Sequence, residues 1–176
     1  MAHETHSTDP SYLEGQRLLR RSVNAPIRMV LMYWLGLHDG ERPPARQQFD
    51  PVDLPSRALP YLFLLERIPG PGWRLRLAGS HLVDALGRDF TGCELVDEQI
   101  PGVSLSRTVR LLNQMAETGL PGHFHGRSTF RFRDNYDDHE QVLLPFRDRK
   151  TGLIEAVLGA IVYEGLQGAF GPGATW

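Results

Sequence analysis

The 176-residue sequence has very little cysteine and lysine. Cys93 is the only cysteine, so no disulfide can form within the chain, and the composition suits a reducing compartment. Lys150 is the only lysine, and 19 basic residues stand against 21 acidic ones. Because the net charge is only −2, nothing in the composition attracts nucleic acid or an anionic membrane, and we expect neither as a partner.

Signals for export and membrane insertion are also missing. The N-terminal stretch MAHETHSTDP is polar and partly acidic, which is unlike a signal peptide. The most apolar run, Ile27 to Leu37, is interrupted by Arg28 and is shorter than the roughly 20 residues that cross a bilayer. We therefore expect a cytoplasmic protein.

Motifs that carry catalysis are absent too. The glycines at 168, 171 and 173 lie in the tail with no strand and helix around them, so they do not form a phosphate-binding loop. The acidic turn Asp134 to Asp138 lacks the glycine and the distal glutamate of a calcium loop. No serine stands at a nucleophile elbow. The sequence therefore predicts no enzymatic activity.

The N-terminal part of the chain predicts two helices. Residues 1–22 form a polar segment, disordered at first and helical from Asp9 and Pro10 onward, because Asp caps helices well and Pro suits the first position. Residues 23–60 hold a second helix, with Asn24 as its cap, followed by a loop.

The second helix is apolar on most of its sides. Its stripe at helical spacing consists of Ile27, Val30, Leu31, Trp34 and Leu35. Such a helix must be covered on more than one side, so it lies either against a second subunit or within the core of its own domain. We expect a homodimer. The candidate interface residues are Met29, Met32, Tyr33 and Trp34.

Residues 61–164 predict a core of strands and helices. The apolar run Tyr61 to Ile68 has the length of a buried strand, and the turn Pro69 to Gly72 leads into a second strand, Trp73 to Leu77, that alternates with arginines. Ser80 is expected to cap a short helix that ends at Gly87. The longest helical pattern runs from Val103 to Thr118.

Three more strands are expected after that helix. The first alternates over residues 123–133 and ends in a turn at Asp134 to Asp138. The second, Gln141 to Arg147, contains Pro145, which indicates a sheet edge or a bulge. The third, Ile154 to Tyr163, is apolar on both faces and is expected at the centre of the sheet. Residues 165–176 form a Gly-rich tail that we expect to be flexible.

Three blocks of sequence carry a family likeness: YWLGL…PARQQFDPVDLPSRALPYLFLLE, WRLRLAGSHLVDALGRDFTGCEL and LLPFRDRKTGLIEAVLGAIVY. With RLAG at Arg76–Gly79 and GRDFTG at Gly87–Gly92, they resemble the bacterial PAS subgroup catalogued as the fifth PAS family. The likeness covers about residues 30–164 and departs at Ala85-Leu86, where an aromatic pair is more usual. It implies an α+β PAS fold, a five-stranded antiparallel sheet with helices on one face, here with an added N-terminal helical segment.

The resemblance implies no fixed cofactor, and two that PAS domains hold are disfavoured. Haem-binding members place a histidine on the long helix before the third strand, and residues 103–118 contain none, which leaves only His81 on the short helix. Flavin photosensors place a reactive cysteine directly after the motif at Gly87 to Asp89. Here Phe90 occupies that position, and Cys93 comes three residues later.

Histidines on the third strand raise the question of a metal site. His123 and His125 are two residues apart on one face, and His139 follows after the turn. If the turn centres near Asn135, His139 pairs with Phe132 and lies more than about 20 Å from His125, because a strand rises about 3.3 Å per residue. We therefore expect no metal.

The resemblance places a ligand pocket between the helices and the inner face of the sheet. The candidate lining residues are Trp73, Leu77, His81, Phe90, Leu112, Met115, Phe130 and Phe132. The expected function is that of a stand-alone sensory or regulatory domain in signal transduction, with a small molecule or a signalling protein as partner. The alternative is an interaction module with a filled core, and an enzyme is less favoured.

Overall fold

The computed structural model describes residues 8–40, 42–97, 105–127 and 136–165. Five antiparallel strands form one sheet, in the spatial order β2-β1-β5-β4-β3. The strands are β1 (Leu62–Arg67), β2 (Trp73–Ala78), β3 (Gly122–Arg127), β4 (Tyr136–Arg147) and β5 (Ile154–Gly165). The predicted α+β class and the five-stranded antiparallel sheet are confirmed.

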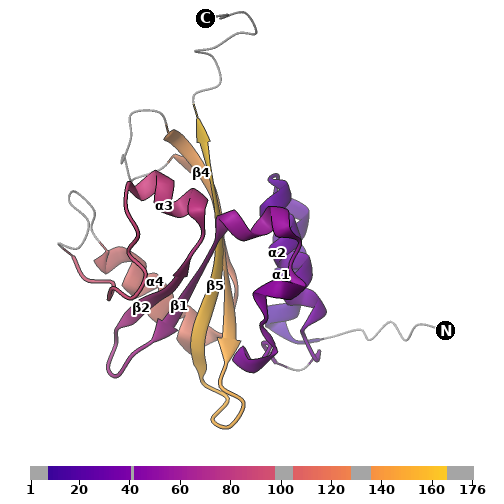
Figure 1. Cartoon of the computed structure of the whole chain (residues 1–176). Coiled ribbons are helices and arrows are strands. Elements are labelled where there is room, and N and C mark those ends of the chain that lie inside the picture. Colours follow the sequence, from indigo (N-terminus) through magenta and orange to yellow (C-terminus); the bar gives the residue numbers. More distant parts are fainter. Residues whose placement is uncertain (1–7, 41, 98–104, 128–135, 166–176) are drawn as a thin grey trace, which may run out of the picture.

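Helices cover both faces of the sheet (Figure 1). On one side, here called the outer face, lie α1 (Pro10–Arg21) and α2 (Ala25–Gly36). On the inner face lie α3 (Ser80–Leu86) and α4 (Ser106–Thr118). Three short 3-10 turns, Arg46–Gln48, Pro51–Asp53 and Ser56–Tyr61, connect α2 to β1. No helix within the described ranges is long and apolar enough to cross a membrane.

The central strand β5 explains why the sheet needs both layers. It pairs with β1 on one side and β4 on the other, and its neighbouring residues Val157 and Leu158 are both fully buried. Successive side chains of a strand point to opposite faces, so Val157 belongs to the inner core and Leu158 to the outer core. The prediction of a central strand buried on both faces is confirmed.

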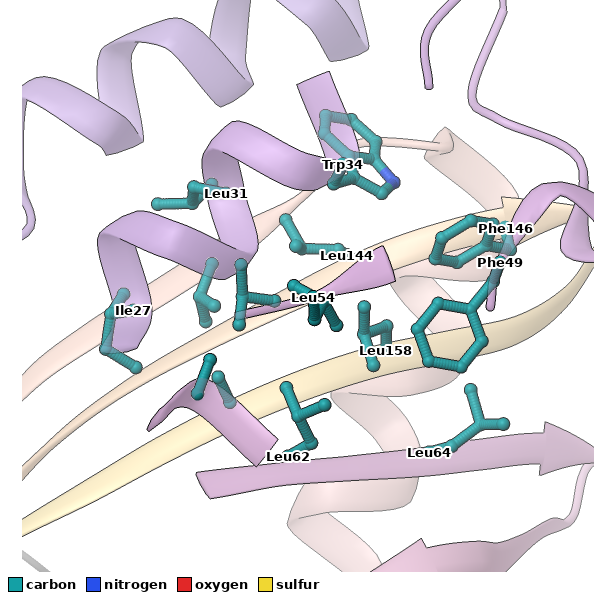
Figure 2. Close-up of a cluster of buried hydrophobic side chains, with 14 of the residues drawn as sticks. Ile27, Leu31, Trp34, Phe49, Leu54, Leu62, Leu64, Leu144, Phe146 and Leu158 are labelled. Atoms are coloured by element: carbon teal, nitrogen blue, oxygen red, sulfur yellow. The ribbon is translucent and has the colours of Figure 1, made fainter. Parts of the chain in front are cut away.

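The outer core lies between α2 and the sheet, and the indole of Trp34 is part of it (Figure 2). Ile27, Leu31 and Trp34 project from α2 toward the sheet, where they meet Leu144 of β4 and Leu158 of β5. The indole nitrogen of Trp34 also donates a hydrogen bond of 3.0 Å to the Pro145 carbonyl. This polar contact fixes the position of α2 over the carboxyl-terminal half of β4.

One flank of α2 is covered by α1. Gly15 of α1 lies so close to α2 that a Cβ there would come within 2.8 Å of the Trp34 ring and 2.9 Å of Leu35. Leu18 of α1 joins the same core with 3% exposure. The chain itself therefore supplies a second cover for α2, and a contact between α2 and a second subunit stays a prediction.

A buried carboxylate holds the start of α2 on the sheet. Glu140 of β4 is completely buried on the outer face. Its oxygens accept hydrogen bonds from the backbone nitrogens of Val23 (3.0 Å) and Asn24 (2.7 Å) and from the Asn24 side-chain nitrogen (2.8 Å). The Nε2 atom of His123 on β3 lies 2.8 Å away. Because the amino end of a helix carries partial positive charge, the carboxylate is well placed there.

The hairpin between β3 and β4 differs from the prediction. β4 begins at Tyr136, so part of the expected turn at Asp134 to Asp138 belongs to the strand. As a result His139 pairs with Gly126 and not with Phe132, and His125 pairs with Glu140. The sequence-based register was wrong because the turn position was assigned from polar composition, whereas pairing with β5 extends the strand to Tyr136.

Pro145 lies where β4 has only one strand neighbour. β3 pairs with β4 no further than Leu143, so Pro145 faces Val157 of β5 on one side only. Proline cannot donate to a strand ladder, and its position beyond the end of β3 avoids that loss. The predicted edge position of Pro145 is confirmed on the side of β4 that β3 does not reach.

The N-cap of the short helix α3 lies one residue earlier than predicted. Gly79 is the N-cap, and Ser80 is the first helical residue, with no side-chain cap hydrogen bond. The Gly79 nitrogen donates to the Leu62 carbonyl at 2.6 Å. A Cβ at Gly79 would collide with the backbone of Pro60 and Leu59. The chain can thus turn from β2 into α3 only with glycine at this position.

Replacing Gly79 with alanine is expected to destabilise the fold by about 1–3 kcal/mol, because backbone atoms cannot move away from the added methyl group as a side chain could. Denaturant unfolding checks this. The matched control is Gly36→Ala at the exposed end of α2, where nothing lies within 4 Å of the added Cβ. That variant should equal or exceed the parent in stability. Equal stability of both variants would contradict the close approach of Gly79 to the backbone of Leu59 and Pro60.

Replacing Glu140 with glutamine is expected to lower the free energy of unfolding by about 2–3 kcal/mol at pH 7, since hydrogen bonds to a buried charge are lost. Burial alone would raise the pKa of Glu140, but hydrogen bonds from His123, Asn24 and Val23 hold it below its ordinary value of 4.5. Its contribution is therefore present above about pH 4.5 and is lost as the pH falls further.

The same denaturation series, recorded from pH 7 to pH 3, separates the charge from other effects. Glu140→Gln should lose part of the acid-dependent decline in stability that the parent shows. Glu14→Gln is the control, because Glu14 makes only a surface ion pair with Arg17, worth less than about 1 kcal/mol. A Glu140→Gln variant as stable as this control would show that the carboxylate is not needed.

Candidate functional site

A cavity lies between the inner face of the sheet and the two inner helices. Its volume is about 160 Å³. Phe63 of β1, Leu75 of β2 and Leu143 of β4 form part of the sheet side, and Leu82 of α3 and Leu111 of α4 form part of the helical side. Protein interiors are ordinarily filled to the density of organic crystals, so space of this size is the strongest candidate for a binding site.

A glycine in the central strand shapes the floor of the cavity. Gly159 of β5 pairs with Phe63 on one side and Leu143 on the other. Any side chain at this position would collide with the Phe63 ring. The Phe63 ring therefore lies directly against β5 at Gly159. It occupies the space that a side chain at residue 159 would need, and it forms part of the cavity wall.

The lining is apolar with few polar groups. Polar side chains at the cavity come from Gln141 of β4, Thr108 of α4 and Glu94. Glu94 is half exposed and is ion-paired with Arg74 at 3.1 Å, so its charge is satisfied outside the cavity. Among the described residues no lysine, arginine or histidine lines the cavity. The described part of the lining therefore offers hydrogen bonds but no positive charge.

Several of the predicted pocket residues belong to the inner core without lining the cavity. Phe90 does line it. Three others pack in the same inner core but do not line the cavity: Trp73, Leu112 and Met115. The indole nitrogen of Trp73 donates to Asn113 of α4 at 2.9 Å, which fixes α4 against β2. Phe130 and Phe132 lie outside the described residues.

Leu77 lies on the opposite side of the sheet from the cavity. Leu64 pairs with Leu77 and Leu65 with Leu75, so Arg76 is an extra residue in β2. This bulge breaks the strict alternation on which the prediction depended. Leu77 therefore packs against the outer core, whereas Leu75, two residues earlier, lines the cavity.

His81 joins α3 to the central strand and does not line the cavity. Its Nε2 accepts a hydrogen bond of 3.0 Å from the Tyr163 backbone nitrogen. Its ring centroid is 4.6 Å from that of Tyr61 and 5.7 Å from that of Tyr163. Burial lowers the pKa of His81, an effect that Asp84 opposes in part. The neutral ring is thus held as a hydrogen-bond acceptor.

The prediction missed most of the residues on the sheet side. Phe63, Gln141, Leu143, Ile161 and Tyr163 all line the cavity. Their alternation within β1, β4 and β5 was visible in the sequence. Which of the two alternating sets faces α3 and α4 could not be read from it, because β4 and β5 are apolar on both faces.

The three histidines considered for a metal do not converge. His123 and His125 point to the outer face, where His123 contacts Glu140 and His125 lies 3.3 Å from Glu164. His139 is adjacent in register but belongs to the opposite face, where its ring centroid lies 4.8 Å from that of Phe124. Among the described residues there is no group of three or more side chains suited to a metal ion.

A cluster of Ser11, His38 and Asp9 has the composition of a catalytic triad but not its geometry. The Nε2 atom of His38 lies 2.8 Å from Ser11 Oγ and 3.2 Å from Asp9 Oδ2. A triad needs the carboxylate on the other ring nitrogen. The Asp9 carboxylate instead accepts from the backbone nitrogens of Ser11 and Tyr12, as the N-cap of α1. The cluster secures α1 to the end of α2.

Comparisons with known proteins agree with this fold. The fifth PAS family model, described as PAS domain, matches residues 23–162. None of the curated proteins matches the sequence. Among solved structures, the PAS domain of histidine kinase ThkA is 16% identical with a TM-score of 0.43, over 57% of this chain and 95% of that one.

The PAS domain from Bordetella pertussis BvgS is 16% identical with a TM-score of 0.39, over 60% of this chain and 77% of that one. Similarity at this level carries no functional argument. The family match does not depend on it, because the family model extends over most of the chain, from the start of α2 to β5. The chain therefore belongs to the PAS domain family, as its sequence blocks predicted.

Proposed function

We propose that this protein is a sensory domain that binds a small molecule in the cavity between the sheet and the helices α3 and α4. Membership of the PAS family supports a role in signal transduction. The observation that carries the finer proposal is the cavity itself, about 160 Å³ of space in an otherwise closely packed core.

Strand β4 contacts the cavity with one face and α2 with the other, so it can transmit the effect of ligand binding to α2. Gln141 and Leu143 line the cavity, whereas Val142 and Leu144 between them pack in the outer core against α2. A ligand that shifts or stiffens this strand on one face therefore acts on α2 on the other. Glu140, on the same strand, holds the start of α2.

The alternative is an interaction module that binds no ligand, and ligand-induced stabilisation separates the two functions. A molecule that binds only the folded state at 100 times its dissociation constant adds about 2.7 kcal/mol to the free energy of unfolding. Thermal unfolding of the protein with neutral and charged metabolites of up to about a dozen heavy atoms should therefore reveal at least one stabilising compound.

Leu111→Trp tests whether such a compound occupies the cavity. Leu111 lines the cavity from α4 and is 46% exposed, so a larger ring there blocks the space with little risk to the fold. The variant should keep its melting temperature and lose the ligand-induced shift. Leu13→Trp on α1, where Leu13 is 42% exposed in the outer layer, is the control and should keep the shift. Binding that survives in Leu111→Trp, or no stabilising compound at all, contradicts the proposal.

Self-association through α2 stays a prediction. Met32 is 58% exposed on α2, and Met29 and Tyr33 are partly buried against the outer core. Trp34 is fully buried within the chain and leaves no surface for a second copy. We propose a homodimer that uses Met32 as its central apolar contact.

Light scattering at micromolar concentration measures the dimer directly. Met32→Glu should give a monomer, because the charge would be desolvated in the interface. Leu153→Glu, at the exposed turn between β4 and β5, is the control and should remain a dimer, since Leu153 is 66% exposed and does not belong to α2. A parent protein that is already monomeric removes the prediction.

A further inference from the structure

The chemistry of the cavity restricts the ligand more narrowly than the fold does. We propose that it takes an uncharged, mainly apolar molecule of about the size of one six-membered ring, with one polar group directed at Gln141. This inference rests on the proposed function, since it names the class of molecule that the same cavity binds.

The volume of the cavity limits the size of the ligand. An engineered apolar cavity of about 150 Å³ in another protein holds benzene, so a cavity of about 160 Å³ accommodates one ring with a small substituent. Haem and the three-ring system of a flavin exceed this space. Phe63, Phe90 and Tyr163 supply aromatic surface around it, which favours a flat ring over a branched chain.

The charges at the cavity exclude ionic ligands. No cationic side chain among the described residues lines it, so a carboxylate or phosphate would be desolvated without a partner. Of the described residues that line the cavity, Glu94 is the only charged one, and its negative charge repels anions. Glu94 already pairs with Arg74 and is half exposed, so it provides no buried site for a cation either.

Gln141 supplies the polar contact. It lines the cavity from β4 and is partly buried, and its amide offers both donors and an acceptor. Its neighbour on the same face of β4, His139, is 95% buried and has its Nδ1 without a partner in the described part of the chain. The Gln141 amide can present its donors and its acceptor to a hydroxyl or carbonyl group in the cavity.

His139 remains neutral beside the cavity. Burial lowers the pKa of His139; the nearby Gln141 amide oxygen and the charges of Asp138 and Glu164 oppose this, and His125 adds to it. The polar group next to Gln141 is therefore an uncharged imidazole and not an imidazolium. This again favours an uncharged ligand over an anion.

Four probes of nearly equal size test the proposed class of ligand: toluene, phenol, benzoate and benzylammonium. Their dissociation constants for the full chain are measured by titration with amide NMR detection. Phenol should bind several-fold more tightly than toluene, and both ions at least about ten-fold more weakly than phenol, since neither finds a buried partner. Tighter binding of benzoate or benzylammonium than of phenol overturns the class.

Gln141→Leu tests the polar contact. It should weaken phenol binding about three- to ten-fold, which corresponds to one hydrogen bond, and leave toluene within about two-fold. Gln114→Leu on the exposed side of α4 is the control and should change neither. Equal loss of phenol and toluene binding, or no loss of phenol binding, contradicts the assigned role of Gln141.

The outcomes separate this inference from the proposed function. If only a charged probe binds and Leu111→Trp abolishes its binding, the ligand class is wrong and the sensory proposal stands. If phenol and toluene bind equally well to the parent and to Leu111→Trp, the cavity is not the site, and both proposals fail. If none of the probes binds the parent protein, the class is likewise wrong.

Discussion

The structure depends on one constraint: the central strand β5 and the second half of the neighbouring strand β4 are apolar on both faces, so both faces of the sheet must be covered. Val157 and Leu158 are adjacent in β5, point to opposite faces and are both fully buried. A sheet of this kind is not stable with helices on one side alone. The helices α1 and α2 are therefore part of the folded unit, and the family match, which starts at residue 23, includes α2.

The two covers differ in how completely they fill the space beneath them. On the outer face, α2 is held by the Trp34 indole, by the Glu140 carboxylate at its amino end and by α1 behind it. On the inner face, α3 and α4 leave a cavity next to Phe63 and Leu143. The outer layer of α1 and α2 is tightly packed, and the inner layer of α3 and α4 leaves space. This difference is consistent with the proposal that the inner side binds a small molecule.

Sequence patterns predicted the elements well but not their registers. The helical stripe of α2, the double-sided strand β5 and the edge position of Pro145 each follow from a local rule and are confirmed. The position of Leu77 depends on a one-residue bulge, and that of His139 on where the turn begins. Both are set by pairing between strands, which local patterns do not contain.

The same limit applies to the candidate site. Phe90 was found because it lies in a family motif, and Leu112 and Met115 because helical periodicity places them in a core. Phe63, Gln141 and Tyr163 line the cavity because of how β1, β4 and β5 are arranged, together with the close approach that Gly159 permits. That approach becomes visible only when the strands are paired.

The central claim is that occupation of the inner cavity is transmitted through β4 to α2. Amide hydrogen exchange of the full chain, with and without saturating phenol, tests it most directly. The account predicts slower exchange in β4 around Leu143 and also in α2, although α2 does not touch the cavity. Slower exchange confined to the cavity wall, with α2 unchanged, would contradict it.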